Sequence, residues 1–414
     1  MSIVYRTKNV ASGDILSYYN EENSSSISID FIKSELSKPV LKPRFRIHWL
    51  NEDETVKTIL PEEDIISGSY SENYQNGQRR SLSITLFNED GRYKPSINGI
   101  WANVKFSFEM GLELGDMSVL WFPKGVYEVT SASTTHEPEN KTVSLELSDK
   151  FSILEGKSGT LESSYIIDVG SEAEDVIRDI LRHQKGDGNP LDPKEFIYDS
   201  SFKGKLIEAQ ISKEAGSNFG EIINEIATQL SAEVFYDTEG HLNFVPINYV
   251  TDDIDKPIIY QIYDYAGDFG SNNLSFDLNS IVNRVIVIGS SVNGEVCQAT
   301  SVNDDPASPL CYQRIGYRTD SPINDTNITN TILAKERADY ELRTRLILKA
   351  SASVSTMYNP LLLVNNFIGV TDEFYGFEQE LFLIQNISID FDSGSMSLSC
   401  TNARNIPFVV GRRG

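Results

Sequence analysis

The sequence predicts a mainly β protein in which two similar β-barrel domains flank a smaller α+β domain. Three observations lead to this fold class. Runs with period-two alternation fill the first third, helical periodicity begins near residue 155, and alternating runs return in the last third. The predicted divisions are an N-terminal arm at 1–40, a first β-barrel domain at 41–155, an α+β domain at 156–275 and a second β-barrel domain with one helix at 276–414.

The first barrel domain is predicted from five alternating segments that are separated by Gly, Asn, Asp and Pro. They are FRIHWL (45–50), SLSITLF (81–87), VKFSFEM (104–110), GVYEVTSAS (125–133) and TVSLELS (142–148). Val, Ile, Phe, Thr and Tyr favour pleated, half-buried strands. Residues 1–40 differ, because the polar run NEENSSSISI at 20–29 suits an arm or a linker.

The acidic run Asn88-Glu89-Asp90-Gly91 follows one of these strands and has two interpretations, a metal-binding loop or a corner between strands. A calcium loop needs alternating Asp or Asn ligands and a later Glu, but Arg92 and Lys94 follow instead. Asp-Gly readily adopts turn geometry. We therefore expect a corner.

The middle domain is predicted from two helical stripes and a hairpin. The first helix starts at Ser171, which forms a capping box with Glu174, and the second starts after Asn218 as N-cap. Their apolar stripes are Val176, Ile177, Ile180 and Leu181, then Phe219, Ile222, Ile223, Ile226 and Leu230. Glu239-Gly240 closes a hairpin behind the second helix.

The last third contains an apolar strand at 280–289, a polar excursion to about residue 327 and one helix at 328–346. In that helix Ala334, Ala338 and Leu342 lie at helical spacing, and we expect it to pack at a barrel seam. Strands follow in LKASASVSTM, LLLVNNFIGV, ELFLIQNISIDF and SMSLSCT.

Two hairpins, 127–149 and 382–402, repeat the same alternation when the turn is allowed a two-residue difference. The matched positions are Tyr127 with Phe382, Val129 with Ile384, Val143 with Met396, Leu145 with Leu398 and Leu147 with Cys400. Each hairpin closes its domain. The repeat predicts an internal duplication of the barrel.

The order of these elements resembles the hub proteins at the centre of the baseplate or tail tip of bacteriophages and related contractile injection systems. The resemblance covers about 40–405 and includes the run NFGEIINEIATQLSAEVFYDTEGHLNFVPI and the strand NSIVNRVIVIG. It implies two tube-type barrels per chain, so that a homotrimer presents six. Such a trimer joins a six-fold tail tube or distal tail ring to a three-fold spike or fibre, at the tail tip of the virion. Residues 1–40 match no pattern of the family.

Charge and composition exclude several functions. Lys and Arg number 36 against 60 Asp and Glu, a net charge of −24, so tight phosphate binding has no electrostatic source. We expect DNA to pass the hub without specific binding, because a channel lined with carboxylates offers no binding sites for the DNA phosphates. The start MSIVYRTKNV lacks a signal peptide and no apolar run is long enough to span a membrane, so no membrane insertion is expected.

No catalytic motif, cofactor site or metal site is predicted. Glu155-Gly156-Lys157-Ser158 resembles the end of a phosphate-binding loop, but Phe151 stands where its first glycine belongs. The histidines, His48, His136, His183 and His241, are isolated and are interpreted as ordinary surface or half-buried side chains. The cysteines, Cys297, Cys311 and Cys400, are interpreted as buried thiols.

Two alternatives to a structural role stay open. A peptidoglycan hydrolase needs only two nearby carboxylates, although no lysozyme-sized segment is left unassigned. A glycan-binding tail module would use aromatic side chains, but most lie inside alternating strands, where core packing is the simpler role. These aromatic residues are Phe106, Phe108, Tyr127, Phe235 and Phe244.

Overall fold

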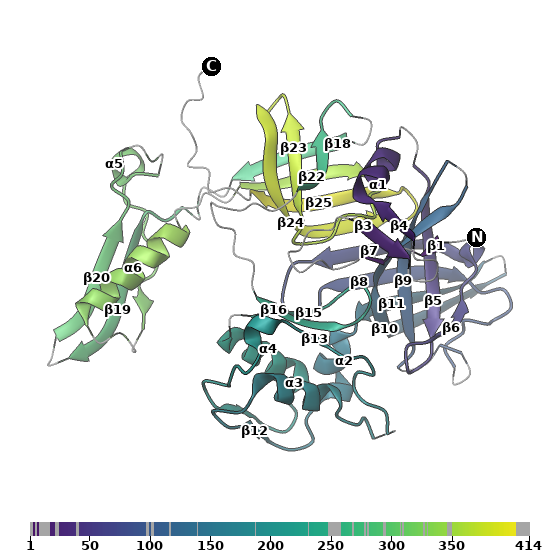
Figure 1. Cartoon of the computed structure of the whole chain (residues 1–414), viewed down its shortest axis with the longest axis horizontal. Helices are drawn as coiled ribbons and strands as arrows, with labels where there is room; N and C mark the ends of the chain where they lie inside the picture. Colours follow the sequence, from purple (N-terminus) through teal and green to yellow (C-terminus); the bar gives the residue numbers. More distant parts are fainter. Residues whose placement is uncertain are drawn as a thin grey trace.

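The structure is a computed structural model of the 414-residue chain. The residues that it describes are 3–4, 6–7, 17–20, 25–38, 41–96, 99–100, 103–115, 117–138, 140–186, 188–230, 232–246, 258–266, 269–276, 279, 281–292, 295–306, 308, 310–325, 328, 330–345 and 350–402. Strands dominate, and 14 of them join in one sheet system that runs from β18 through β24 and β7 to β6 (Figure 1).

Six neighbouring strands make up what we call the first array, in the order β7-β8-β11-β10-β9-β5. Their bounds are β7 Ile65–Asn73, β8 Arg80–Phe87, β11 Asn140–Asp149, β10 Val119–Glu137, β9 Lys105–Glu113 and β5 Pro43–Leu50, with β6 Val56–Ile59 beside β5. Alternation decides which side chains face inward, as in β8, where Leu82, Ile84 and Leu86 are buried.

The second array has six strands in the corresponding order, β18-β22-β25-β24-β23-β17. Their bounds are β18 Phe269–Phe276, β22 Ala350–Met357, β25 Ser395–Asn402, β24 Phe377–Asp390, β23 Phe367–Asp372 and β17 Ile258–Tyr263. The sixth strand differs, because β5 is antiparallel to β9 whereas β17 is parallel to β23. These arrays stand where the two similar barrels were predicted, so the predicted fold class is confirmed.

The duplicated hairpin is confirmed in its register and in its irregularity. In β10·β11 Val129 lies opposite Leu147, and the register then shifts before Ser131. In β24·β25 Ile384 lies opposite Cys400, and the register shifts at the matching place, before Asn386. A bulge adds one unpaired residue and twists the strand locally. Because the bulge lies at the same position in both hairpins, the two hairpins repeat one structure.

The α+β unit packs around its own core, which runs from Phe151 to Phe244. Its elements are α2 Phe151–Glu155, β12 Tyr165–Ile167, α3 Ala173–Leu181, β13 Ile197–Tyr198, β14 Ile211–Lys213, α4 Phe219–Gln229, β15 Ala232–Tyr236 and β16 Leu242–Pro246. The predicted range 156–275 differs at its end, because β17 and β18 leave this unit and pair in the second array.

Of the two predicted helix N-caps, one is confirmed and one is wrong. The Asn218 cap is confirmed, because its Oδ1 accepts a hydrogen bond from the N–H of Glu221 at 2.9 Å. The capping box at Ser171 is wrong. Glu172 is the N-cap of α3 and makes no side-chain cap bond, while Ser171 accepts a backbone bond from Ile207. The carboxylate of Glu174 pairs with Arg178 one turn later.

Between β18 and β22 the chain forms a small lobe with its own core, set apart from both arrays (Figure 1). It contains β19 Arg284–Val292, β20 Glu295–Val302, α5 Tyr312–Ile315, β21 Ile323–Asn324 and α6 Thr331–Arg345. The barrel-seam prediction for the helix is therefore wrong. Ala334, Ala338 and Leu342 of α6 pack against Val285 and Val287 of β19 instead.

The described part of the N-terminal segment contains a helix and short strands. Helix α1, Ile29–Leu36, begins at Ser28, whose Oγ accepts from the N–H of Phe31 at 3.2 Å. Its buried side chains Ile32 and Leu36 belong to the core of the arrays. Short strands precede it, β1 Ile3–Val4, β2 Arg6–Thr7, β3 Ser17–Asn20 and β4 Ser25–Ser28, and β1 pairs with β10.

Candidate assembly interface

The two arrays meet edge to edge, because the outer half of β24 pairs antiparallel with β7. The register sets Asn386, Ile387, Ser388, Ile389 and Asp390 opposite Asn73, Glu72, Ser71, Tyr70 and Ser69. Backbone bonds flank this ladder, from Phe391 N–H to the Gly68 carbonyl at 2.9 Å and from Tyr74 N–H to the Gln385 carbonyl at 2.7 Å. One chain thus supplies both strands of an array-to-array junction.

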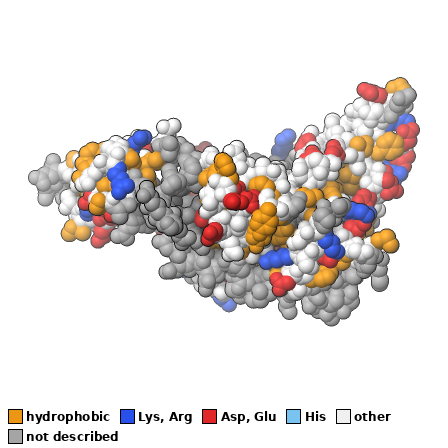
Figure 2. Space-filling model, turned by 90° about the horizontal axis from the view of Figure 1, so that it is seen from above, with side chains coloured by type: hydrophobic (Ala, Val, Ile, Leu, Met, Phe, Trp, Pro, Cys, Tyr) orange, Lys and Arg blue, Asp and Glu red, His pale blue; other side chains and the backbone are white. Residues whose placement is uncertain are grey.

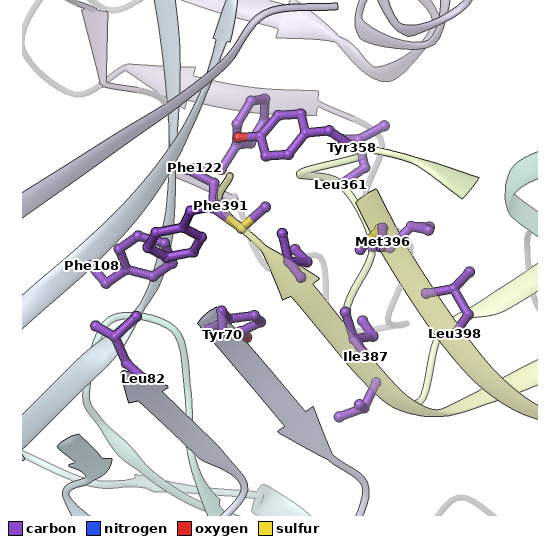
Figure 3. Close-up of a cluster of buried hydrophobic side chains, with 14 of the residues drawn as sticks. Tyr70, Leu82, Phe108, Phe122, Tyr358, Leu361, Ile387, Phe391, Met396 and Leu398 are labelled. Carbon is purple, nitrogen blue, oxygen red and sulfur yellow. The ribbon is translucent and has the colours of Figure 1, made fainter. Parts of the chain in front are cut away.

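Phe391, at the tip of the β24–β25 hairpin, fixes this junction from the core side. Its ring stacks on Phe45 with centroids 4.0 Å apart. It also lies 5.3 Å from the ring of Phe108, and Figure 3 shows Phe391 and Phe108 side by side. Gly68 leaves the space for it, because a Cβ at Gly68 would lie 2.6 Å from the Phe391 ring. The two arrays therefore share one continuous hydrophobic core.

A buried ion pair lies beneath the junction. The guanidinium of Arg80 donates to the Glu72 carboxylate at 2.5 Å, and the Tyr70 hydroxyl donates to the same carboxylate at 3.1 Å. Burial, and then the Glu72 charge, raise the pKa of Tyr70 well above its usual value. Lys124 is buried beside this group, and its Nζ donates to the Leu362 carbonyl at 3.0 Å. Burying a polar or charged side chain without a hydrogen-bond partner costs free energy. The side chains of this cluster are therefore stable here because each has a partner.

A second set of buried bonds attaches the α+β unit to the first array. Arg79 pairs with Glu233 of β15, and the guanidinium of Arg79 covers the half-buried Phe235 ring at 3.7 Å. Arg80 donates to the Tyr236 carbonyl at 2.5 Å. The carboxylate of Asp149 accepts from the backbone N–H groups of both arginines, at 2.7 and 2.9 Å. Arg79 and Arg80 thus attach the β15 side of the α+β unit to the first array.

Glu54 is the centre of a third buried cluster on the same side of the first array. Its carboxylate lies 2.8 Å from the ammonium groups of both Lys105 and Lys150, and Lys150 also reaches Asp192 at 2.6 Å. Burial opposes ionisation of Glu54, but the charges of Lys150 and Lys105 outweigh it and lower the pKa of Glu54 to about 2. The cluster therefore depends on an ionised Glu54.

Strand β10 has an open edge over its second half in the described part of the chain. Beyond Glu128 strand β10 leaves β9 and pairs only with β11, and its residues from Thr130 to Glu137 are all exposed. Strand β18 also has an open edge, because it pairs with β22 alone and ends the sheet path, and β6 and β17 likewise pair on one side only. An open edge presents unpaired N–H and C=O groups to another chain.

The acidic run 88–91 is a turn, as expected. Gly91 has φ +72° and its N–H donates to the Asn88 carbonyl at 3.2 Å. The side chains are engaged locally, since Asn88 Oδ1 accepts from Tyr93 N–H and Asp90 accepts from Arg92. In the described residues no group of three His, Cys, Asp or Glu side chains is arranged to hold a metal ion.

The remaining candidates from the sequence lie apart from the junction. Residues 155–158 cross from the end of α2 into a 3-10 turn. The surface or half-buried interpretation is wrong for His48, which is buried with Nδ1 3.1 Å from Ser107 Oγ. His241 is half-buried, and His136 and His183 are exposed. All three cysteines are free and buried, as predicted. Phe106, Phe108, Tyr127 and Phe244 are core residues.

On the face in Figure 2, the coloured Lys and Arg side chains are scattered and do not gather into a patch. Within the described residues no helix is long and apolar enough to cross a membrane.

Sequence reasoning missed the junction itself, although part of its signal was present. β8 reads SLSIT at 81–85 and β22 reads SASVS at 351–355, and the two occupy matching places in the arrays. Phe391 carried no signal, because its partners Phe45 and Phe108 are far away in sequence.

Known proteins were compared with the chain by sequence and by structure. No family model and no curated protein sequence matches it. Among solved structures, the 43 kDa tail protein of prophage MuSo2 from Shewanella oneidensis superimposes with a TM-score of 0.57 at 14% identity, covering 88% of this chain and 99% of that one. This chain has the fold of a phage tail protein. The resemblance drawn from the sequence is thus confirmed at the level of the fold.

Two further structures share this tail-protein fold. A tail protein from Neisseria meningitidis MC58 gives a TM-score of 0.54 at 11% identity, with 86% of this chain and 96% of that chain covered. A chain of the Francisella PdpA-VgrG complex gives 0.55 at 12% identity, with 90% of this chain and 60% of that chain covered.

Proposed function

We propose that this protein is the structural hub of a phage baseplate or tail tip, and that it works as a homotrimer. The observation that carries the proposal is the pair of matching arrays in one chain, joined edge to edge by β7 and β24. Three chains with two arrays each make six array positions around one axis. Closed rings match best when their interface counts agree, so this trimer fits a six-fold partner while keeping three-fold symmetry for another.

The partners follow from this symmetry. The six-fold face suits a tail tube or distal tail protein ring, and the three-fold face suits a central spike or tail fibre. The shared fold with the prophage MuSo2 tail protein and with a chain of the PdpA-VgrG complex supports a place in such a particle. DNA passes through the channel without specific binding, in keeping with the net charge of −24.

The role is non-enzymatic and needs no cofactor. The two alternatives predict activities that purified protein would display, namely clearing of peptidoglycan by a hydrolase or binding on a glycan array by an attachment module. We expect neither. Clearing that survives repurification, or a reproducible glycan specificity, would replace the structural role by the corresponding alternative.

The mass in solution tests the trimer directly. Three chains of 46.4 kDa give about 139 kDa, which sedimentation equilibrium separates from a monomer or dimer. We expect the trimer to form with rising protein concentration. A chain that stays at 46.4 kDa at high concentration would contradict the proposal.

A further inference from the structure

We infer that the open half of β10 pairs antiparallel with β18 of a neighbouring copy, in a register fixed by the junction inside the chain. The inferred pairs are Ala132 with Phe276, Ser133 with Ser275, Thr134 with Leu274 and Thr135 with Asn273 of the neighbour. This inference rests on the proposed trimer and specifies the contact that closes its ring.

Strand β10 corresponds to β24 in the duplication. Tyr127 and Phe382 start the duplicated hairpins, a shift of 382 − 127 = 255 residues, and the bulge follows at the same place in both. The segment of β24 that contacts β7, Asn386 to Asp390, therefore corresponds to Ser131 to Thr135 of β10.

Strand β7 corresponds to β18. Tyr70 lies opposite Leu82, which lies opposite Leu147. In the second array, Leu274 lies opposite Ala352, which lies opposite Cys400. Because Leu147 and Cys400 are matched positions of the hairpins, Tyr70 corresponds to Leu274, a shift of 274 − 70 = 204 residues.

Details of the two edge strands agree with this match. β7 has a register shift between Ile65 and Ser67, and β18 has one between Phe269 and Ser271, again 204 residues later. Hydroxyl pairs also repeat at matched positions. Ser71 Oγ lies 2.8 Å from Ser81 Oγ, and Ser275 Oγ lies 2.7 Å from Ser351 Oγ.

The junction inside one chain has a counterpart between two copies. Inside the chain, the outer half of the β24 hairpin strand binds β7, the edge strand of the other array. The matched pair is β10 and β18, and each has an open edge in the described part of the chain; the match to β24 and β7 singles them out from the other one-sided strands, β6 and β17. Pairing them between copies would continue the same contact from one chain to the next.

The composition of both edges suits burial against a partner. Residues 130–135 read TSASTT and residues 269–276 read FGSNNLSF, without one charged side chain in a protein that is 23% charged. Exposed edge strands are normally protected from pairing by charges or proline. The absence of such protection at two matched edges indicates that β10 of one copy pairs with β18 of its neighbour.

Disulfide cross-linking of the full chain tests the register. The backbone bonds of Phe391 to Gly68 and of Tyr74 to Gln385 place Ser388 and Ser71 in a non-hydrogen-bonded pair, so their counterparts Ser133 and Ser275 are one too. Such pairs have Cα atoms about 4.5 Å apart, within the range that a disulfide spans. The test variant is therefore S133C/S275C, and the matched control is S133C/N273C, which is two residues out of register on the same face.

Both variants are oxidised after sedimentation has established their mass, and are then separated on non-reducing gels. We expect most of S133C/S275C to become covalent dimer and trimer, while S133C/N273C stays largely monomeric on the gel and wild type, whose cysteines are buried, does not cross-link. A trimer in which the two variants cross-link equally, or not at all, would overturn the register and leave the hub intact. A mass of one chain without cross-links would overturn both.

Discussion

The rings of Phe391 and Phe45 stack with their centroids 4.0 Å apart, although 346 positions separate the two residues (391 − 45). Phe391 belongs to the second array and Phe45 to the first, so this contact joins the repeated halves of the chain. We expect F391A to destabilise the protein by about 3–5 kcal/mol, since it removes a buried aromatic ring from the shared core. Urea denaturation measures this. F374A is the control, because Phe374 is 87% exposed and its truncation should change the free energy of unfolding by no more than about 0.5 kcal/mol.

Gly68 is expected to be coupled to Phe391. In G68A the new methyl group would meet the Phe391 ring at 2.6 Å and the Ser83 carbonyl at 2.8 Å, so we expect a loss of about 1–3 kcal/mol. The loss should be smaller in an F391A background, by about 1 kcal/mol, and a double-mutant cycle of urea unfolding measures the difference. Additive losses would contradict a steric contact between these two positions.

Glu54 makes stability depend on acid pH. A carboxyl whose pKa falls on folding contributes stability that is fully present above its unfolded value of 4.5 and is lost as pH falls toward about 2. This lowering of the Glu54 pKa corresponds to about 3 kcal/mol in the free energy of unfolding. The difference in unfolding free energy between wild type and E54Q should therefore be largest near neutral pH and should shrink between pH 4.5 and 2. The exposed Glu63 supplies the control variant, E63Q, whose difference from wild type should remain small throughout.

Ala338 tests the independence of the small lobe. Ala338 is fully buried between α6 and the β19–β20 sheet, so A338D places a carboxylate in an apolar core. We expect hydrogen exchange to lose protection at 281–345 while the arrays keep theirs and the trimer still forms. E336A, on the exposed face of α6, should leave the exchange pattern unchanged. Loss of the trimer in A338D would instead indicate that the lobe supports the ring.

Two proline variants separate the inferred contact between copies from the hairpin within one chain. By the match to Ile389, which hydrogen-bonds β7, the N–H of Thr134 points toward the neighbour, and that of Ser133 points toward β11. T134P should leave monomer stability nearly unchanged but weaken each junction of the trimer by about 1–3 kcal/mol. S133P should destabilise the monomer instead. Sedimentation gives the trimer constant and thermal melting gives the stability, and equal behaviour of the two variants would contradict the inferred pairing.

Much of the fold was predictable because it is encoded by short-range patterns. Alternation in 81–87 indicated a strand with Leu82 and Leu86 inward, and Asn218 marked the start of a helix. The repeat of two hairpins predicted a duplication, and even the position of the bulge agrees. Such features depend on neighbours within a few residues, so the sequence displays them directly.

The predictions that failed depend on contacts between distant segments. Ser171 satisfies the pattern of a capping box, but its backbone pairs with the loop at Ile207, and the helix starts one residue later. Ala338 shows helical spacing, yet spacing cannot tell which sheet a helix covers. The polar approach to α1 resembled a linker, although Ile32 and Leu36 are buried in the main core.

By itself, the sequence determined the elements, the duplication and the acidic character of this protein, because alternation, caps and charge are local or additive properties. The tertiary structure alone decided how the repeated halves meet. The β7–β24 register, the space at Gly68 that receives Phe391 and the open edges of β10 and β18 all depend on pairing between segments far apart in the chain. Strand pairing uses backbone groups that every residue carries, so the side-chain pattern does not specify which strand lies next to which.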